Sequence, residues 1–254
     1  MKKISKILLL LSFALVFNIN AQDAEMDPAA AEAYNEGNQM MKAGNYSGAL
    51  EKYDTALETT KDYRIYYQKG VTLKKLRKYK DAEEALKSGI ELNPDFYLFY
   101  NALGGVYFSE GQYQNAAETF KKFADMSDKA AYKEKANQYV ALAYTKLGES
   151  AKSDGDYGNA TKFLSLAVSS SPYDAAYLSL AQIYVETGEY DKALEAADKA
   201  LNNRSKISRG GPLYYKGMAF KALGEKDKAI EAFEAGRKDP QYKNLSEYEL
   251  ETLQ

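Results

Sequence analysis

The stretch "ETGEYDKALEAADKAL", Glu186 to Leu201, ends one apolar, tyrosine-rich segment, turns at Gly188 and begins an alanine-rich segment. Its pattern, Gly-x-Tyr-x-x-Ala, returns elsewhere along the chain, which is typical of internal repeats. The other full copies are Gly44/Tyr46/Ala49, Gly111/Tyr113/Ala116 and Gly155/Tyr157/Ala160, and the weaker copies are Tyr79/Ala82 and Gly224/Ala229.

The alanines of this pattern mark a period. Ala49, Ala82, Ala116, Ala160, Ala193 and Ala229 are separated by 33, 34, 44, 33 and 36 residues. Twelve residues before each alanine stands a small residue: Gly37, Gly70, Gly104, Gly148, Ala181 and Gly217. Apolar residues around both positions follow helical spacing, so each unit is predicted to be two helices joined by a tight turn. The glycine and the alanine are expected to let the two helix backbones approach closely.

These residues resemble the tetratricopeptide repeat family, whose 34-residue unit reads W-x2-L-G-x2-Y, then A-x3-F, then P. Repeat three matches it with Tyr100, Leu103, Gly104, Tyr107, Ala116 and Phe120. Tyrosine stands in place of tryptophan, and repeats one, three and five lack the closing proline. The resemblance implies an all-α fold: a right-handed superhelical α-solenoid of about six helix-turn-helix units plus a C-terminal capping helix.

The repeat boundaries follow from this period. We expect a tail at 22–29, an array over 30–242 and a capping helix at 243–254, in which Leu245, Tyr248 and Leu253 would cover repeat six. The predicted units are 30–62, 63–96, 97–127, 128–173, 174–207 and 208–242. The fourth is longer because 128–140, which has no proline or glycine, extends a helix. This extension is either a projecting contact or a tolerated insertion.

The N-terminal 21 residues have the layout of a secretory signal peptide. Lys2, Lys3 and Lys6 precede an apolar run at 7–17, and cleavage is expected before Gln22. A membrane anchor is the alternative, but the run is about half of the ~20 residues that a spanning helix needs. The protein is therefore expected to be exported, either periplasmic or secreted, with no stable membrane insertion after cleavage.

Composition narrows the classes of function. Without the leader lysines, 31 basic residues face 36 acidic ones, a formal charge of about −5, which does not favour nucleic-acid binding. The chain has no histidine and no cysteine, so disulfides and the commonest general base are absent. Asp154 and Asp156 begin like a calcium loop, but Gly158 occupies a ligand position. We expect no enzyme, no catalytic residue, no metal site and no cofactor.

The remaining expectation is recognition by shape. The resemblance implies that the first helices of the repeats line a concave groove that takes an extended peptide or a partner helix. Helical phase places these residues on that face: Tyr34, Asn35, Asn38, Arg64, Tyr67, Gln68, Lys74, Asn101, Phe108, Gln182 and Tyr215. Some relatives hold a chaperone's C-terminal carboxylate there, but Leu98 and Ala102 stand where that pattern has basic residues.

The residues fit two functions. The first is an adaptor of a bacterial-type cell envelope that binds a protein or peptide in the groove. The second is a structural subunit of a larger envelope or secretion assembly. Tyrosine is enriched at interfaces of both kinds. The sequence leaves the identity of the partner and the oligomeric state open.

Overall fold

The computed structural model describes residues 25–254, so the predicted signal peptide lies outside the described residues. The described chain contains thirteen helices and no strand. The helices are α1 (Pro28–Lys42), α2 (Tyr46–Thr59), α3 (Tyr63–Lys75), α4 (Tyr79–Leu92), α5 (Leu98–Ser109), α6 (Tyr113–Met126), α7 (Ala130–Ser153), α8 (Tyr157–Ser170), α9 (Asp174–Glu186), α10 (Tyr190–Asn202), α11 (Gly210–Ala222), α12 (Lys226–Gly236) and α13 (Lys243–Glu251).

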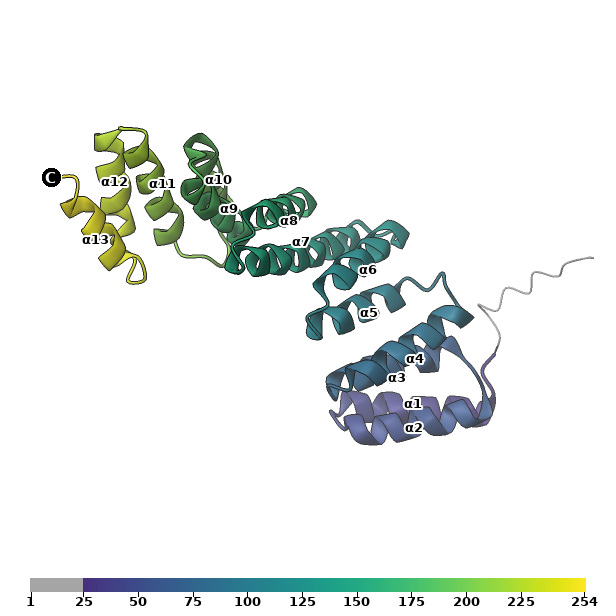
Figure 1. Ribbon diagram of the computed structural model, residues 1–254. Helices are drawn as coiled ribbons and strands as arrows, with labels where there is room; N and C mark the ends of the chain where they lie inside the picture. The colour runs from purple at the N-terminus through teal and green to yellow at the C-terminus, as the bar shows by residue number, and fades with distance from the viewer. Residues whose placement is uncertain (1–24) are drawn as a thin grey trace, which may run out of the picture.

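The helices form antiparallel pairs that stack in chain order, from α1 and α2 at one end to α13 at the other (Figure 1). Each odd-numbered helix up to α11 packs on the even-numbered helix that follows it, and each even-numbered helix packs on the first helix of the next pair or, for α12, on α13. The predicted all-α repeat solenoid is therefore confirmed. No helix of the described residues combines the length and the apolar character that crossing a membrane requires.

The recurring glycine of the pattern lies in the turn inside each pair. Gly44, Gly111, Gly155, Gly188 and Gly224 have φ angles between 76° and 80°. Glycine adopts this left-handed conformation without the steric cost that a Cβ brings. In the second pair Arg77 takes the same place with φ 60°, so this copy keeps the turn although it lacks the glycine.

The recurring alanines are the contact residues of the second helices. All six alanines of the pattern have no exposed surface. The tyrosine three residues earlier is the first residue of the second helix in five of the six pairs, and Lys226 takes its place in the last. The pattern therefore marks one turn, one helix start and one buried contact in every repeat.

The small residue of the first helix makes room for a large side chain of the second. In the first repeat, a Cβ added to Gly37 would lie 2.6 Å from the ring of Tyr53. The same relation holds sixteen residues apart in four other repeats: Gly70 with Leu86, Gly104 with Phe120, Gly148 with Leu164 and Gly217 with Phe233. The expected contact of glycine with alanine is thus a secondary one, because the space belongs mainly to the side chain four residues after the alanine.

The fifth repeat is built differently at this contact. Ala181 stands in place of glycine, and Ala197 stands in place of the large side chain. Both alanines are fully buried in one core cluster. The first helix gains the methyl group of Ala181, and the second helix has the small Ala197 in place of a large side chain. The two changes offset each other, so the interior stays closely packed.

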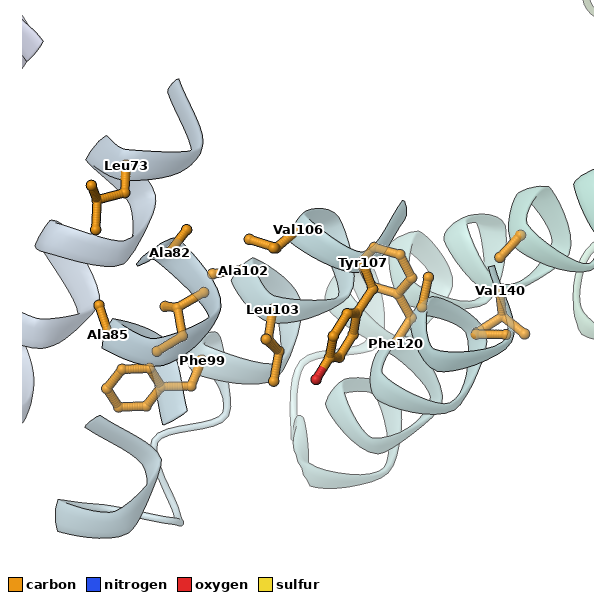
Figure 2. Packing of buried hydrophobic residues seen from close by; sticks show 14 residues of the cluster. Leu73, Ala82, Ala85, Phe99, Ala102, Leu103, Val106, Tyr107, Phe120 and Val140 are labelled. Atoms are coloured by element: carbon orange, nitrogen blue, oxygen red, sulfur yellow. The ribbon is translucent and has the colours of Figure 1, made fainter. Parts of the chain in front are cut away.

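Helix α7 contains 24 residues and holds the extra length of the fourth repeat. Its first half packs on α6, where the rings of Phe120 and Tyr139 lie 4.9 Å apart between centroids. Its second half packs on α8, where Tyr144 stacks on Phe163 at 6.4 Å. Val140 of α7 belongs to the core cluster that runs from Leu73 through α5 and α6 (Figure 2). Helix α7 therefore joins the two halves of the array.

The last helix packs on repeat six with a different face from the one expected. Leu245 is 49% exposed and Tyr248 is 64% exposed. Ser246 and Glu249 are buried instead, and Lys221 of α11 forms an ion pair of 2.6 Å with Glu249. The expectation that Leu245 and Tyr248 would cover the array is wrong. The hydroxyl of Ser246 lies against Gly236, where an added Cβ would come within 3.1 Å of it, and it has no hydrogen-bond partner within residues 25–254.

Candidate functional site

A hollow of about 480 Å³ opens among the first helices α3, α5 and α7. We call it the central hollow. Its lining is largely apolar and aromatic, with two lysines and one amide, which is the usual composition of a ligand-binding cleft. It is lined by Tyr67, Val71, Lys74, Lys75, Asn101, Ala102, Gly105, Phe108, Ser109, Phe120, Tyr139 and Leu142.

The hollow is open because α5 and α7 do not pack closely on each other. Among successive first helices, α1 contacts α3, α3 contacts α5, α7 contacts α9 and α9 contacts α11. Helices α5 and α7 form no comparable contact. The rings of Phe120 and Tyr139 lie against each other between them and contribute the deep part of the hollow. Figure 2 shows Phe120 beside Tyr107 of α5, and both belong to the same core cluster.

Tyr67 forms a fixed wall of the hollow. Its ring meets Phe96 and Phe99 edge to face, with centroids 5.3 and 5.7 Å away. Burial raises the pKa of its hydroxyl. Sequence phase placed Tyr67 on the exposed face, but the side chain is half-buried against the core of repeats two and three. It is a packing residue as well as a lining residue.

Lys74 is the half-buried cation of the hollow. Its ammonium group lies over Gly105, in the place that a Cβ at this position would occupy. Burial, followed by the repulsion of Lys75, lowers the pKa of Lys74. Across residues 25–254 it forms no ion pair and no hydrogen bond, and the same is true of the side-chain amide of Asn101. Both groups therefore stay available to a ligand.

A second hollow of about 490 Å³ lies between α1 and α3, lined by Asn38, Met41, Lys42 and Gln68. We call it the N-terminal hollow. The hydroxyl of Tyr53 donates a hydrogen bond of 2.8 Å to Oδ1 of Asn38, so this amide is oriented from the core. Its NH2 group is the end that can still donate to a ligand.

Six of the residues predicted from helical phase line these hollows, and five do not. Arg64 is held by Asp62 at the start of its own helix, and this bond is the main cause of its raised pKa. Gln182 bridges two helices, accepting from Lys152 at 2.8 Å and donating to Glu186 at 2.8 Å. Tyr34 packs on Tyr53, and Asn35 is exposed. Tyr215 packs on the core cluster that contains Ala181 and Ala197.

The residues predicted from helical phase include none from the α7 side of the hollow. Lys146 of α7 has the helical phase of the groove face. Counting back four and then three residues from Lys146 gives Leu142 and Tyr139, the two α7 residues that line the central hollow. The signal was present, but the length of the extension hid how far the stripe continues. Lys75, Ser109 and Phe120 were also missed.

Within residues 25–254, no three or more acidic side chains converge in a group that could hold a metal ion. Asp156 instead begins α8 and accepts a hydrogen bond of 3.0 Å from the backbone of Asn159. The aspartates that resemble the start of a calcium loop therefore belong to the turn between α7 and α8.

Comparison with known sequences identifies the repeat. The sequence model described as "Tetratricopeptide repeat" matches residues 67–131, 145–212 and 178–243, which is more than half of the chain. The chain belongs to the tetratricopeptide repeat family. It is 27% identical over 150 residues to small glutamine-rich tetratricopeptide repeat-containing protein 2 of Saccharomyces cerevisiae, covering 55% of this chain and 43% of that protein. The chain spans less than half the length of the curated relatives it matches.

Solved structures of this tetratricopeptide repeat fold resemble the array at low identity. The 41-end segment of MamA from Desulfovibrio magneticus RS-1 aligns with a TM-score of 0.51 at 21% identity, over 72% of this chain and 100% of that chain. YrrB, described as a tetratricopeptide repeat protein with an unusual peptide-binding site, aligns with a TM-score of 0.50 at 16% identity, over 80% of this chain and 96% of that chain. At these identities the likeness concerns the fold.

Proposed function

We propose that this tetratricopeptide repeat protein is a non-catalytic adaptor that binds an extended segment of a partner protein along its first helices. The observation that carries the proposal is the central hollow, where aromatic walls surround an amide and an ammonium group that have no partner within residues 25–254. The N-terminal hollow lies on the neighbouring pair of first helices and extends the same face. An extended peptide crossing both hollows would bury apolar side chains and satisfy these polar groups.

Replacing Asn101 with alanine is expected to weaken peptide binding about tenfold, equivalent to ~1.4 kcal/mol. The unfolding midpoint should stay nearly unchanged, since such surface changes usually cost less than about 0.5 kcal/mol. The measurement is capture of a randomised peptide library by the immobilised chain, followed by titration of the selected peptides. Tyr67 is unsuitable for this test, because its packing on Phe96 and Phe99 couples it to stability.

The matched control is Lys162→Ala on α8, an exposed position that lines neither hollow. It should retain full binding. The proposal would be contradicted if Asn101→Ala kept full peptide binding and Lys162→Ala lost it. That result would place the binding surface on the outer face.

Export to the cell envelope is part of the proposal, supported by the basic, apolar and small-residue order of the first 21 residues. N-terminal sequencing of the protein from an envelope fraction is expected to begin at or near Gln22. A chain that starts at Met1 and sediments with membranes would contradict export by a cleaved leader.

A permanent subunit of a larger envelope or secretion assembly is the alternative, and the exposed pair Leu245 and Tyr248 on α13 favours it. Large apolar side chains that neighbour each other on one exposed face are often covered by a partner. Sizing of the native protein in crude extract separates the two functions. An adaptor elutes partly as the free chain, whereas a subunit elutes almost wholly with its partners.

A further inference from the structure

The central hollow contains a glycine whose place in the helix is explained by a lysine. Gly105 lies inside α5, where glycine weakens a helix relative to alanine. The preceding Gly104 faces Phe120 of the second helix, but Gly105 does not. Outside its own helix, the atoms within 4 Å of a Cβ added to Gly105 are Nζ and Cε of Lys74. The missing side chain thus leaves the space that the ammonium group fills.

The charge in the hollow is unbalanced. Its lining holds Lys74 and Lys75 but no aspartate or glutamate. Lys74 is half-buried, and no acidic side chain of residues 25–254 pairs with it. A cation that is partly removed from water without a counter-ion is costly, and an anion brought to the same place recovers that cost.

The groups around the ammonium narrow the chemistry of the anion. Asn101 stands one helical turn before Gly105, so its amide faces the same hollow and can donate a hydrogen bond to a second oxygen. Phe108, Tyr139 and Leu142 supply apolar walls. One ammonium and one amide beside apolar walls suit a carboxylate, which accepts at both oxygens, next to an apolar side chain.

The position of the hollow favours a side chain over a chain end. The central hollow lies between α3 and α7, and the N-terminal hollow continues the face towards α1. The row of first helices continues beyond α7 to α9 and α11, so a segment laid along this face can pass through the central hollow and present side chains to it. In an extended segment, residues two apart point to the same side.

We propose that the central hollow binds an internal aspartate or glutamate of an extended partner segment, together with an aromatic or apolar residue two positions away. The inference rests on the adaptor function proposed above and names the partner chemistry of that site. Lys74 pairs with the carboxylate, Asn101 donates to it, and Gly105 keeps the ammonium in place. Helix α7 supplies part of the apolar wall, with Tyr139 from the extension at 128–140 and Leu142 just after it.

The test uses three pools of ten-residue peptides with acetylated N-termini. The first pool fixes phenylalanine at position four and glutamate at position six, with a C-terminal amide and uncharged residues elsewhere. The second pool has glutamine at position six. The third pool has the same glutamine and a free C-terminal carboxylate. Affinity of each pool is measured for the full chain and for its variants.

The wild-type chain should bind the glutamate pool at least tenfold more tightly than the glutamine pool. Lys74→Met should abolish this preference, because the carboxylate then has no ammonium group to pair with. Gly105→Ala should do the same, because its Cβ takes the place of the ammonium while the helical backbone accepts alanine. Lys80→Met removes the same charge from an exposed position outside the hollow and should keep the preference.

Each other outcome decides a different point. Equal binding of the glutamate and glutamine pools overturns the proposal but leaves the adaptor function standing. A preference that survives both Lys74→Met and Gly105→Ala also overturns it. Tighter binding of the third pool shows that the hollow takes a chain end, which overturns the assignment to a side chain. Binding of none of the pools overturns peptide capture itself.

Discussion

Replacing Asp174 with alanine is expected to lower the free energy of unfolding by about 3 to 5 kcal/mol, because three backbone donors lose their acceptor. Asp174 is the first residue of α9 and is fully buried. Its Oδ2 accepts from the backbone N–H groups of Ser205, Lys206 and Ile207 at 2.6, 2.6 and 3.1 Å. One carboxylate therefore ties the start of repeat five to the linker that leads into repeat six.

The same carboxylate makes stability depend on pH. Burial alone would favour the neutral acid, but the backbone N–H groups of 205–207 and Ala175 outweigh it and lower the pKa of Asp174 from its ordinary value. A carboxyl group with a lowered folded-state pKa stabilises the protein above its unfolded-state pKa. That contribution is lost as the pH falls through the folded-state value. The stability difference between wild type and Asp174→Asn should thus shrink only below about pH 4.

Asp191→Asn is the control, because Asp191 also lies in the first turn of a helix, α10, but is exposed. Its effect should stay within about 0.5 kcal/mol. Hydrogen exchange at the amides of 205–207 provides the local measurement and should accelerate only in the Asp174 variants. Unchanged exchange in Asp174→Ala would show that the linker is held by other contacts.

The sequence predicted the architecture because every repeat carries the same turn, helix start and buried contact. Tyr190 and Ala193 could be placed from the spacing of the pattern alone. The Asp174 clamp could not, since its acceptors and donors are joined only by the fold, 31 to 33 residues apart in sequence. The pairing of Gly148 with Leu164 was likewise invisible as long as the alanine was taken as the main contact.

Residues of the candidate site could be predicted where helical spacing alone decides which face of a helix a side chain lies on. Helical spacing identified Lys74, Asn101 and Phe108, which line the central hollow. It failed for Arg64, because an aspartate two residues earlier binds the side chain locally. Helical spacing also did not predict that the Tyr67 side chain is half-buried, because Phe96, which packs against its ring, leads into the following repeat.

Leu164→Ala in α8 is expected to cost about 2 to 5 kcal/mol, since it deletes a fully buried side chain. Gly148→Ala is expected to cost up to about 3 kcal/mol from overpacking, offset in part by ~1 kcal/mol of helix propensity. The added Cβ would lie 2.6 Å from Cγ of Leu164 and 3.2 Å from the carbonyl oxygen of Ala160. Each single change therefore disturbs the same contact from one side.

The double variant should be more stable than the sum of the two losses predicts, by about 1 kcal/mol or more. The new methyl group enters the space that Leu164 leaves, which reproduces the arrangement of Ala181 and Ala197 in repeat five. The rescue is partial because the carbonyl of Ala160 still crowds the methyl group. Combining Leu164→Ala with Gly104→Ala, whose partner Phe120 lies in another repeat, should give additive losses. The measurement is chemical unfolding. Additivity in the first pair as well would mean that the glycine is not needed to admit the large side chain, and that its recurrence in five of the six repeats has another cause.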